Sequence, residues 1–326
     1  DDIETISVLK DASATAVYGV RGANGVMLIT TKRGKEQKPE VSLTANWQFQ
    51  SPTREDTYLN SYESVTLLEE ALANDGLPSQ FSAAQIDMYK KSVAGQLSGI
   101  DALLYPNVDW YDHILKGSAP AQRYNVSVRG GTKRMRYYAS GEFYDQKGLV
   151  KNLSNDMYGN SSSPAFRRYA FRANMDLFLT TDLTFSVNFG TRFEERSGGN
   201  FTENELFYEM NHTPGWLFPV SYEIQNGETT KTLYGGNSQY QNNIAARLAN
   251  AGYYRATNTV NETNFIADYK MDWLTEGLSA KAMVSFDYDS YYKRNFTNTF
   301  ATYELLKDEN GNAIDPTVME GFNRFN

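Results

Sequence analysis

Strict alternation of apolar and polar residues dominates the chain after residue 40. From Val41 to Phe49 every second residue is apolar, and the residues between them are Ser, Thr, Asn and Gln. Because successive side chains of a β-strand point to opposite faces, this pattern predicts a strand with one apolar and one polar face. The pattern returns six times, around residues 124–129, 134–143, 168–177, 183–192, 264–273 and 278–288. Most of these strands are near the ~9–11 residues that cross an outer membrane.

The connections between the predicted strands are long and short in turn. Tight turns are predicted at residues 130–132, 180–182 and 274–277. The long connections are residues 51–122, 147–164, 197–257 and 293–326. Membrane barrels have short periplasmic turns and long outer loops, whereas a soluble sandwich has less reason to alternate in this way. The pattern therefore favours a mainly β fold, a transmembrane antiparallel β-barrel.

Two helices are predicted inside the first long connection. Ser61 is expected to cap a helix that continues through Leu72. Ser82, with Gln85 three residues later, matches a capping box. We expect these helices to form a small ordered subdomain outside the membrane.

The beginning of the chain has a compact, glycine-rich pattern instead. Residues 6–9 indicate a short strand, and residues 26–31 form an apolar, β-prone run that predicts a buried strand. Between them, residues 11–17 favour a helical turn, and residues 19–25 a glycine-rich turn. Residues 34–39 form a charged linker. We expect the true N-terminus to lie outside this chain.

Composition narrows the class of protein. Aromatic residues make up 14% of the chain, with 23 tyrosines, which suits surfaces that are partly apolar and partly wet, such as a membrane interface or a sugar-binding surface. The net charge is −8 without a basic run, so nucleic acid is not an expected partner. The absence of cysteine excludes disulfides and thiol catalysis. His113 and His212 lie far apart, so we expect hydrogen-bonded loop residues and neither a metal nor a cofactor.

No catalytic constellation stands out. Residues 19–25 lack the ending of a phosphate-binding loop and precede a strand rather than a helix. No nucleophile elbow is present, and the carboxylates are scattered, so an enzyme is not expected. Six arginines are predicted on polar strand faces, and they suggest a hydrated lumen wall whose charges pair with plug carboxylates or, alternatively, a path for an anionic substrate. They are Arg129, Arg134, Arg136, Arg168, Arg172 and Arg192.

The first 34 residues resemble a known family. They read IETISVLKDASATAVYG over residues 3–19, RGANGV over residues 21–26 and ITTKRG over residues 29–34. This stretch resembles the closing segment of the plug in TonB-dependent receptors, and its form is similar to that of the SusC/RagA branch of the Bacteroidota. Val20 stands where that branch usually has a small residue. The resemblance implies a structural or gating role for Lys10, Asp11, Tyr18, Gly19, Arg21, Gly22, Asn24 and Gly25.

A second match supports the resemblance. Residues 109–112, 124–131 and 137–141 are similar to the early barrel of the same branch. Outer-membrane transporters of this class have about 22 strands and a plugged lumen. The resemblance therefore implies that residues 1–35 are the C-terminal segment of a plug and that residues 36–326 begin the barrel. We expect the TonB-contacting segment, the first half of the plug and most of the barrel to lie outside this chain.

The resemblance also implies a function. It predicts a multi-pass protein of the bacterial outer membrane, surrounded by lipid, that imports oligosaccharides or peptides. TonB would supply the energy, and a SusD-like surface lipoprotein would cover the outer loops. The substrate-contacting residues are not indicated by the sequence. Two alternatives stay open, a soluble β-rich glycan-binding or glycan-cleaving protein and a purely structural surface adhesin.

Overall fold

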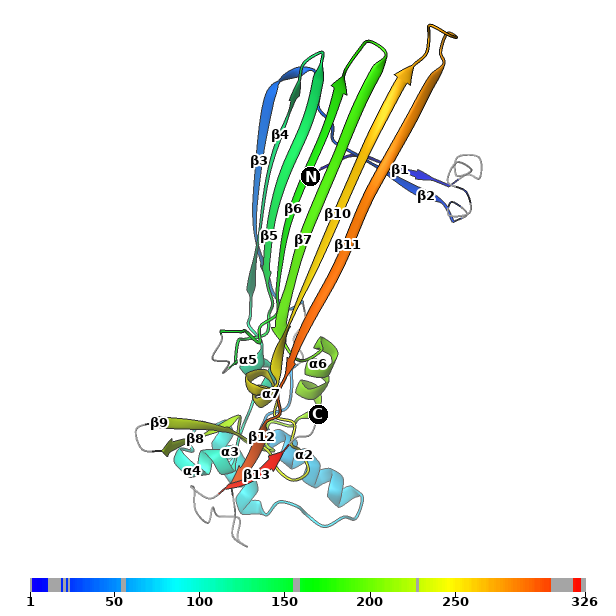
Figure 1. Ribbon diagram of the computed structural model, residues 1–326. Coiled ribbons are helices and arrows are strands. Elements are labelled where there is room, and N and C mark those ends of the chain that lie inside the picture. The colour runs from blue at the N-terminus through cyan, green and yellow to red at the C-terminus, as the bar shows by residue number, and fades with distance from the viewer. Residues whose placement is uncertain are drawn as a thin grey trace.

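The computed structural model describes residues 2–10, 19, 22, 24–53, 57–154, 159–226, 229–305 and 319–323 of the 326-residue chain. Its main sheet has the seven strands that alternation predicts. They are β3 (Gln37–Gln50), β4 (Ala119–Gly131), β5 (Met135–Lys147), β6 (Ala165–Phe178), β7 (Leu183–Gly199), β10 (Gly252–Lys270) and β11 (Ser279–Thr297). All neighbours are antiparallel, in the order β11-β10-β7-β6-β5-β4-β3 (Figure 1).

The strands are longer than predicted, with 13 to 19 residues each. The extra residues extend β4, β7, β10 and β11 into segments that were expected to be connections. Residues 252–263 show the reason, because Tyr253 and Tyr254 are adjacent there and three polar residues separate Ala256 from Val260, which leaves no strict period-2 signal. The backbone pairs equally well without that signal, since ladder hydrogen bonds do not depend on the side chains.

The two faces of the sheet differ as the alternation predicts. One face carries the apolar positions of every strand and is open on this chain: Val41, Leu43 and Phe49 of β3 are 69%, 73% and 79% exposed. The opposite face carries most of the Arg, Asn, Asp and Glu side chains, and the apolar face becomes charged only near its loop end. We call them the apolar face and the polar face.

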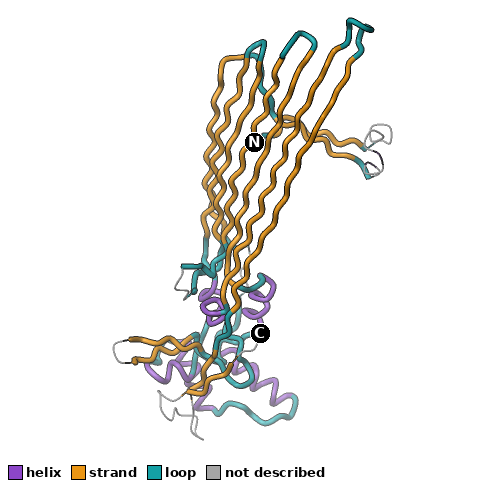
Figure 2. The backbone as a smooth tube through the Cα atoms, viewed as in Figure 1, coloured by secondary structure: helices purple, strands orange, loops and turns teal. Residues whose placement is uncertain are grey.

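Helices and short strands gather at one end of the sheet, where the long connections leave it (Figure 2). We call these elements the loop layer. Tight turns join the strands at the other end. The elements of the long connections are α2 (Ser61–Asn74), α3 (Ala83–Val93), α4 (Gly99–Leu104), α5 (Trp110–Ile114), α6 (Glu203–His212), β8 (Ser221–Asn226), β9 (Thr229–Tyr234), α7 (Ile244–Asn250), β12 (Ala301–Leu305) and β13 (Met319–Asn323). Among the described residues, no helix is long and apolar enough to cross a membrane.

The predicted helix caps are half correct. Ser82 and Gln85 form the expected capping box at the start of α3. The cap of α2, however, is Asn60, whose side chain accepts the Glu63 N–H, and Ser61 is the first helical residue. Ser61 is buried, and its hydroxyl donates to the carbonyl of Pro106 at 2.8 Å. It therefore holds the start of α2 against the chain at Pro106 instead of capping the helix.

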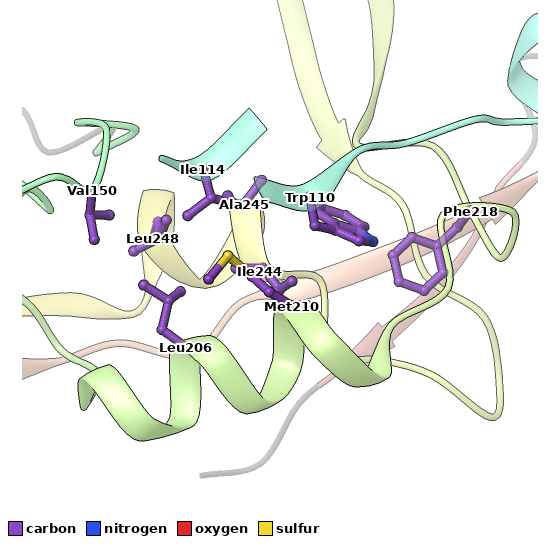
Figure 3. Packing of buried hydrophobic residues seen from close by; sticks show 9 residues of the cluster. All are labelled: Trp110, Ile114, Val150, Leu206, Met210, Phe218, Ile244, Ala245 and Leu248. Atoms are coloured by element: carbon purple, nitrogen blue, oxygen red, sulfur yellow. The ribbon is translucent and has the colours of Figure 1, made fainter. Parts of the chain in front are cut away.

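The loop layer has a hydrophobic core of its own (Figure 3). The core joins three connections that are distant in sequence, so the ordered subdomain is larger than the first loop alone predicts. Its buried residues are Trp110, Ile114, Val150, Leu206, Met210, Phe218, Ile244, Ala245 and Leu248.

Near the N-terminus both predicted strands are present as β1 (Ile3–Leu9) and β2 (Val26–Thr31), and they pair in a separate antiparallel hairpin. The prediction that residues 26–31 are buried is wrong for this chain, because Met27 and Ile29 are 63% and 51% exposed. Only the base of the hairpin lies on the sheet, and the rest extends away from it (Figure 1). The helical turn predicted for residues 11–17 falls outside the described residues.

The arrangement of turns and loops sets up a test of orientation. If the loop layer is extracellular, a cysteine placed at Ser98 will react with a membrane-impermeant maleimide on intact cells, and one at Thr181 will not. Both positions are exposed in the structure, so access through the membrane decides the outcome. Labelling of Thr181 alone would reverse the topology.

Candidate functional site

The base of the β1–β2 hairpin contacts the polar face of the sheet. Asp2, which precedes β1, accepts a hydrogen bond from the Tyr138 hydroxyl at 2.8 Å. The same carboxylate lies 3.7 Å from the Arg172 guanidinium. Tyr138 is 2% exposed, so its hydroxyl is held in a protected position on β5. Asp2 is thus tied to two neighbouring strands.

The second strand of the hairpin is held at the same base by β6. The Asn174 amide donates to the carbonyl of Lys32 at 2.8 Å and to the hydroxyl of Thr31 at 3.2 Å. Next to it, Arg33 forms an ion pair with Asp176 at 2.8 Å. Thus both strands of the hairpin make polar contacts with the polar face of the sheet, at the base of the hairpin.

A row of polar side chains crosses the sheet at this level. Strand register places Tyr138 opposite Asn174, Asn174 opposite Asn188, Asn188 opposite Asn264, and Asn264 opposite Ser285. Asn174 is 2% exposed, and the side-chain oxygens of Asn174 and Asn188 are buried without a hydrogen-bond partner. Such acceptors are rare in folded proteins, and they leave the row able to receive further donors.

The linker from the hairpin to β3 approaches the sheet very closely at Gly34. A Cβ atom there would lie 2.1 Å from the Tyr137 nitrogen and 2.6 Å from its carbonyl oxygen. Only glycine permits this approach, because a backbone cannot yield as a flexible side chain does. The hairpin is therefore fixed to the wall through its own chain as well as through side chains.

The arginines predicted on the polar face are mostly paired. Among the described ion pairs of these arginines, only that of Arg172 with Asp2 reaches the hairpin, and the other carboxylates belong to the linker or to the sheet. The pairs are Arg129 with Glu40, Arg136 with Glu36, Arg168 with Glu142, Arg172 with Asp2, and Arg192 with Glu194. Arg134 lies in the turn between β4 and β5 and not on a strand face, which corrects its placement. The paired charges favour a hydrated wall over an anion path.

The described motif residues taken from the family resemblance, Lys10, Gly19, Gly22, Asn24 and Gly25, lie away from the base of the hairpin. Lys10 and Asn24 are exposed, and the Gly22 carbonyl accepts the Gly25 N–H at 3.0 Å. Gly19 and Gly25 have φ of 62° and 90°, which favours glycine. Asp11, Tyr18 and Arg21 fall outside the described residues. The structure thus brings other residues to the wall, namely Asp2, Thr31, Lys32 and Arg33.

Both histidines lie in helices, His113 in α5 and His212 in α6, and not in the loops expected for them. The described residues hold no group of three or more His, Cys, Asp or Glu side chains that could bind a metal. The Nδ1 of His212 lies 2.8 Å from the Tyr208 carbonyl within α6, so this nitrogen carries the proton. Burial lowers the pKa of His113, in α5, which favours its neutral form.

Loss of the Asn174 amide is expected to loosen the hairpin. In Asn174→Ala the Lys32 carbonyl and the Thr31 hydroxyl lose their partner, at a cost of about 1–3 kcal/mol. Limited proteolysis of the protein would show faster cleavage within residues 30–36. Asn264→Ala is the matched control, since it lies in the same row but pairs with Ser285. Equal cleavage of the two variants would contradict the role of Asn174.

Comparison with known proteins gives a consistent set of relatives. The chain is 30% identical to TonB-dependent receptor P26 of Formosa agariphila, in an alignment of 336 positions that covers all of this chain. It is 34% identical over 189 residues, 57% of the chain, to TonB-dependent receptor SusC of Bacteroides thetaiotaomicron. The structure matches that of the RagAB peptide transporter with a TM-score of 0.66 at 20% identity, over 90% of this chain and 32% of the solved one. No protein-family model matches.

The chain belongs to the SusC/RagA type of TonB-dependent receptors. It spans 29% of the length of P26, and its match to SusC covers 15% of that protein. The seven-stranded sheet is part of an antiparallel outer-membrane barrel with a plug, and the apolar face is the surface that meets lipid in such a barrel. The polar face, which carries the hairpin, is the inner wall of this SusC/RagA-type receptor.

Proposed function

We propose that this chain forms the joint between plug and barrel in a TonB-dependent importer of the outer membrane. Residues 1–35 would be the C-terminal segment of the plug, and residues 36–326 would begin the barrel. The observation that carries the proposal is the contact of the hairpin base with the polar face, through Asp2 and through Asn174. In this proposal the hairpin extends from the wall toward the lumen and forms the closing part of the plug.

Energy for import would be mechanical. Hydrogen bonds like those at the hairpin base contribute about 0.5–1.5 kcal/mol each in a folded protein. A pull transmitted by TonB could therefore break plug contacts one after another and let them form again, without covalent chemistry. No catalytic group is needed for such a cycle, and the relatives are receptors and transporters.

The proposed substrates are oligosaccharides or peptides too large for porins, delivered under a SusD-like lipoprotein lid. RagAB is described as a peptide transporter. A protein lid also suits the loop layer, because Phe207, Tyr208 and Tyr240 are 43%, 62% and 44% exposed there. Aromatic side chains of this kind are enriched at protein interfaces.

A soluble glycan-binding protein fits the structure less well. It would leave the apolar face in water over all seven strands, which is an aggregation surface. Fractionation of the full-length protein and its migration on detergent gels before and after heating separate the two functions. A folded barrel sediments with the outer membrane and migrates differently once heated.

Uptake by whole cells tests the import function itself. A strain lacking the full-length receptor is offered labelled oligosaccharides and labelled oligopeptides above the porin limit. We expect one class to fail to enter, and entry to return with the receptor gene only when TonB is present. Entry of both classes at the parental rate in the deletion strain would reject import as the function, and it would leave a surface adhesin as the remaining candidate.

A further inference from the structure

A row of aromatic rings crosses the apolar face near its loop end. Strand register places Tyr124 opposite Phe143, Phe143 opposite Tyr169, and Tyr169 opposite Phe193. Neighbouring ring centroids are 6.3, 5.1 and 6.4 Å apart. We call these four residues the aromatic row. Rings in such a row are typical of the level where the lipid core of a membrane meets the headgroups.

The apolar face changes to charge directly beyond the aromatic row. Arg167 is two residues from Tyr169, and Glu195 is two residues from Phe193, so both side chains share the face of the rings. Two residues of strand correspond to about 7 Å. The charged positions therefore lie at headgroup depth on the side of the barrel that meets lipid.

A cavity of about 430 Å³ opens at this level. Its described lining contains four cationic side chains, from Lys116, Lys147, Arg167 and Arg255, and one carboxylate, from Glu195. Ser161, Ser163 and Ser197 add hydroxyl groups to the lining. We call this cavity the cationic cavity.

Carboxylates neutralise only part of this charge. Asp145 contacts both Lys147 at 3.2 Å and Arg167 at 2.9 Å, and Glu195 lies 3.5 Å from Arg255. Lys116 contacts neutral partners, the Gly148 carbonyl and the Ser163 hydroxyl. Burial lowers the pKa of Lys116, and the charge of Lys147 lowers it further, so a nearby anion would stabilise the charged form of Lys116.

We propose that the cationic cavity binds the phosphate group of an anionic membrane lipid, a phosphorylated glycolipid of the outer leaflet. The face and depth of the cavity direct it to lipid, and the excess of positive charge selects a negative headgroup. Arginine and lysine are the residues that bind phosphate oxygens through charge-assisted hydrogen bonds. The bound lipid would hold the receptor at a fixed height and connect the segment of residues 159–164 to the membrane surface. This inference rests on the proposed orientation, with the loop layer outside, but not on import.

Lipid retained by the purified full-length receptor tests the proposal. The variant Arg167→Gln with Arg255→Gln removes two cations of the cavity. The control, Arg196→Gln with Lys293→Gln, removes two cations from the polar face at the same height. Receptors are mixed with phosphatidylcholine vesicles that contain either a phosphorylated glycolipid or its dephosphorylated form, and bound glycolipid is measured by mass spectrometry. Inorganic phosphate alone serves as a third probe.

We expect the cavity variant to retain at least tenfold less phosphorylated glycolipid than the parent and the control. A second variant, Arg167→Lys with Arg255→Lys, keeps the charge and is expected to keep most of the binding, which separates lost charge from lost folding. Equal retention by the cavity variant, or equal binding of the dephosphorylated lipid, would overturn the proposal. Full competition by inorganic phosphate at equal concentration would also overturn it, in favour of a small-anion site. Because no nutrient is present, these outcomes are independent of the uptake test.

Discussion

Replacing Gly34 with valine is expected to separate the N-terminal hairpin from the wall. The new Cβ would lie 2.1 Å from the Tyr137 nitrogen and 2.7 Å from the Arg136 carbonyl carbon, and both are backbone atoms of β5. Relief requires the linker or the strand to move, and forced overpacking of this kind costs about 1–3 kcal/mol or more. The contacts of Asp2 with Tyr138 and of Arg33 with Asp176 are then expected to break. Arg33 directly precedes the linker, and Asp2 pairs through its carbonyl with the Lys32 N–H.

Cells that carry Gly34→Val should therefore leak. The measurement is sensitivity to a large antibiotic that the outer membrane normally excludes, together with growth on the native nutrient. Gly117→Val is the matched control, because no atom lies within 4 Å of a Cβ placed at Gly117 and its φ is not positive. If the two variants exclude the antibiotic equally well, the linker does not secure the plug.

A charge on the apolar face is the second change with a large expected effect. Val187 lies between Met175 and Phe265 in the register of the sheet. An arginine at Val187 would meet lipid near the midplane, at a cost of about 2–4 kcal/mol. The neighbouring substitution Asn188→Arg places the same side chain on the polar face, where water and carboxylates can receive it, so its cost is expected to be much smaller.

Folding titrations of the full-length receptor into detergent or lipid measure this difference. The informative quantity is the gap between the two variants, because both add the same charge to adjacent residues of β7. Equal free energies of unfolding would mean that the apolar face does not contact lipid at Val187.

The strands were predictable to the extent that the membrane imposes a pattern on them. From Val41 to Phe49, lipid on one side and a wet lumen on the other force strict alternation, and the strand is readable. In residues 252–263 the few apolar side chains are irregularly spaced, so the sequence lacks the alternation that separates a strand from a loop. Helix α6 was missed although Thr202 and Glu205 form a capping box, a signal that resembles the one recognised at Ser82.

The candidate site was less accessible to sequence reasoning. The polar strand faces indicated that Arg172, Asn174 and Asp176 line a wall, but not which of them meets the hairpin. The contact with Asp2 joins residues about 170 positions apart, and strand register decides it. The family motif directed attention to the glycine-rich turn. The contacts with the polar face come instead from the base of the hairpin, where the sequence offers only common polar residues.

The core of the loop layer has a consequence for how the receptor assembles. Trp110 reaches it from the connection before β4, Val150 from the one between β5 and β6, and Leu206 and Ile244 from the one after β7, so the core is complete only when all three connections meet. Contacts between segments this distant in sequence form slowly. The layer is therefore expected to close only after those strands have paired. An antibody specific for the closed layer would then recognise finished receptors and ignore those still in assembly, which makes the cell-surface end of the molecule a reporter of its membrane-embedded wall.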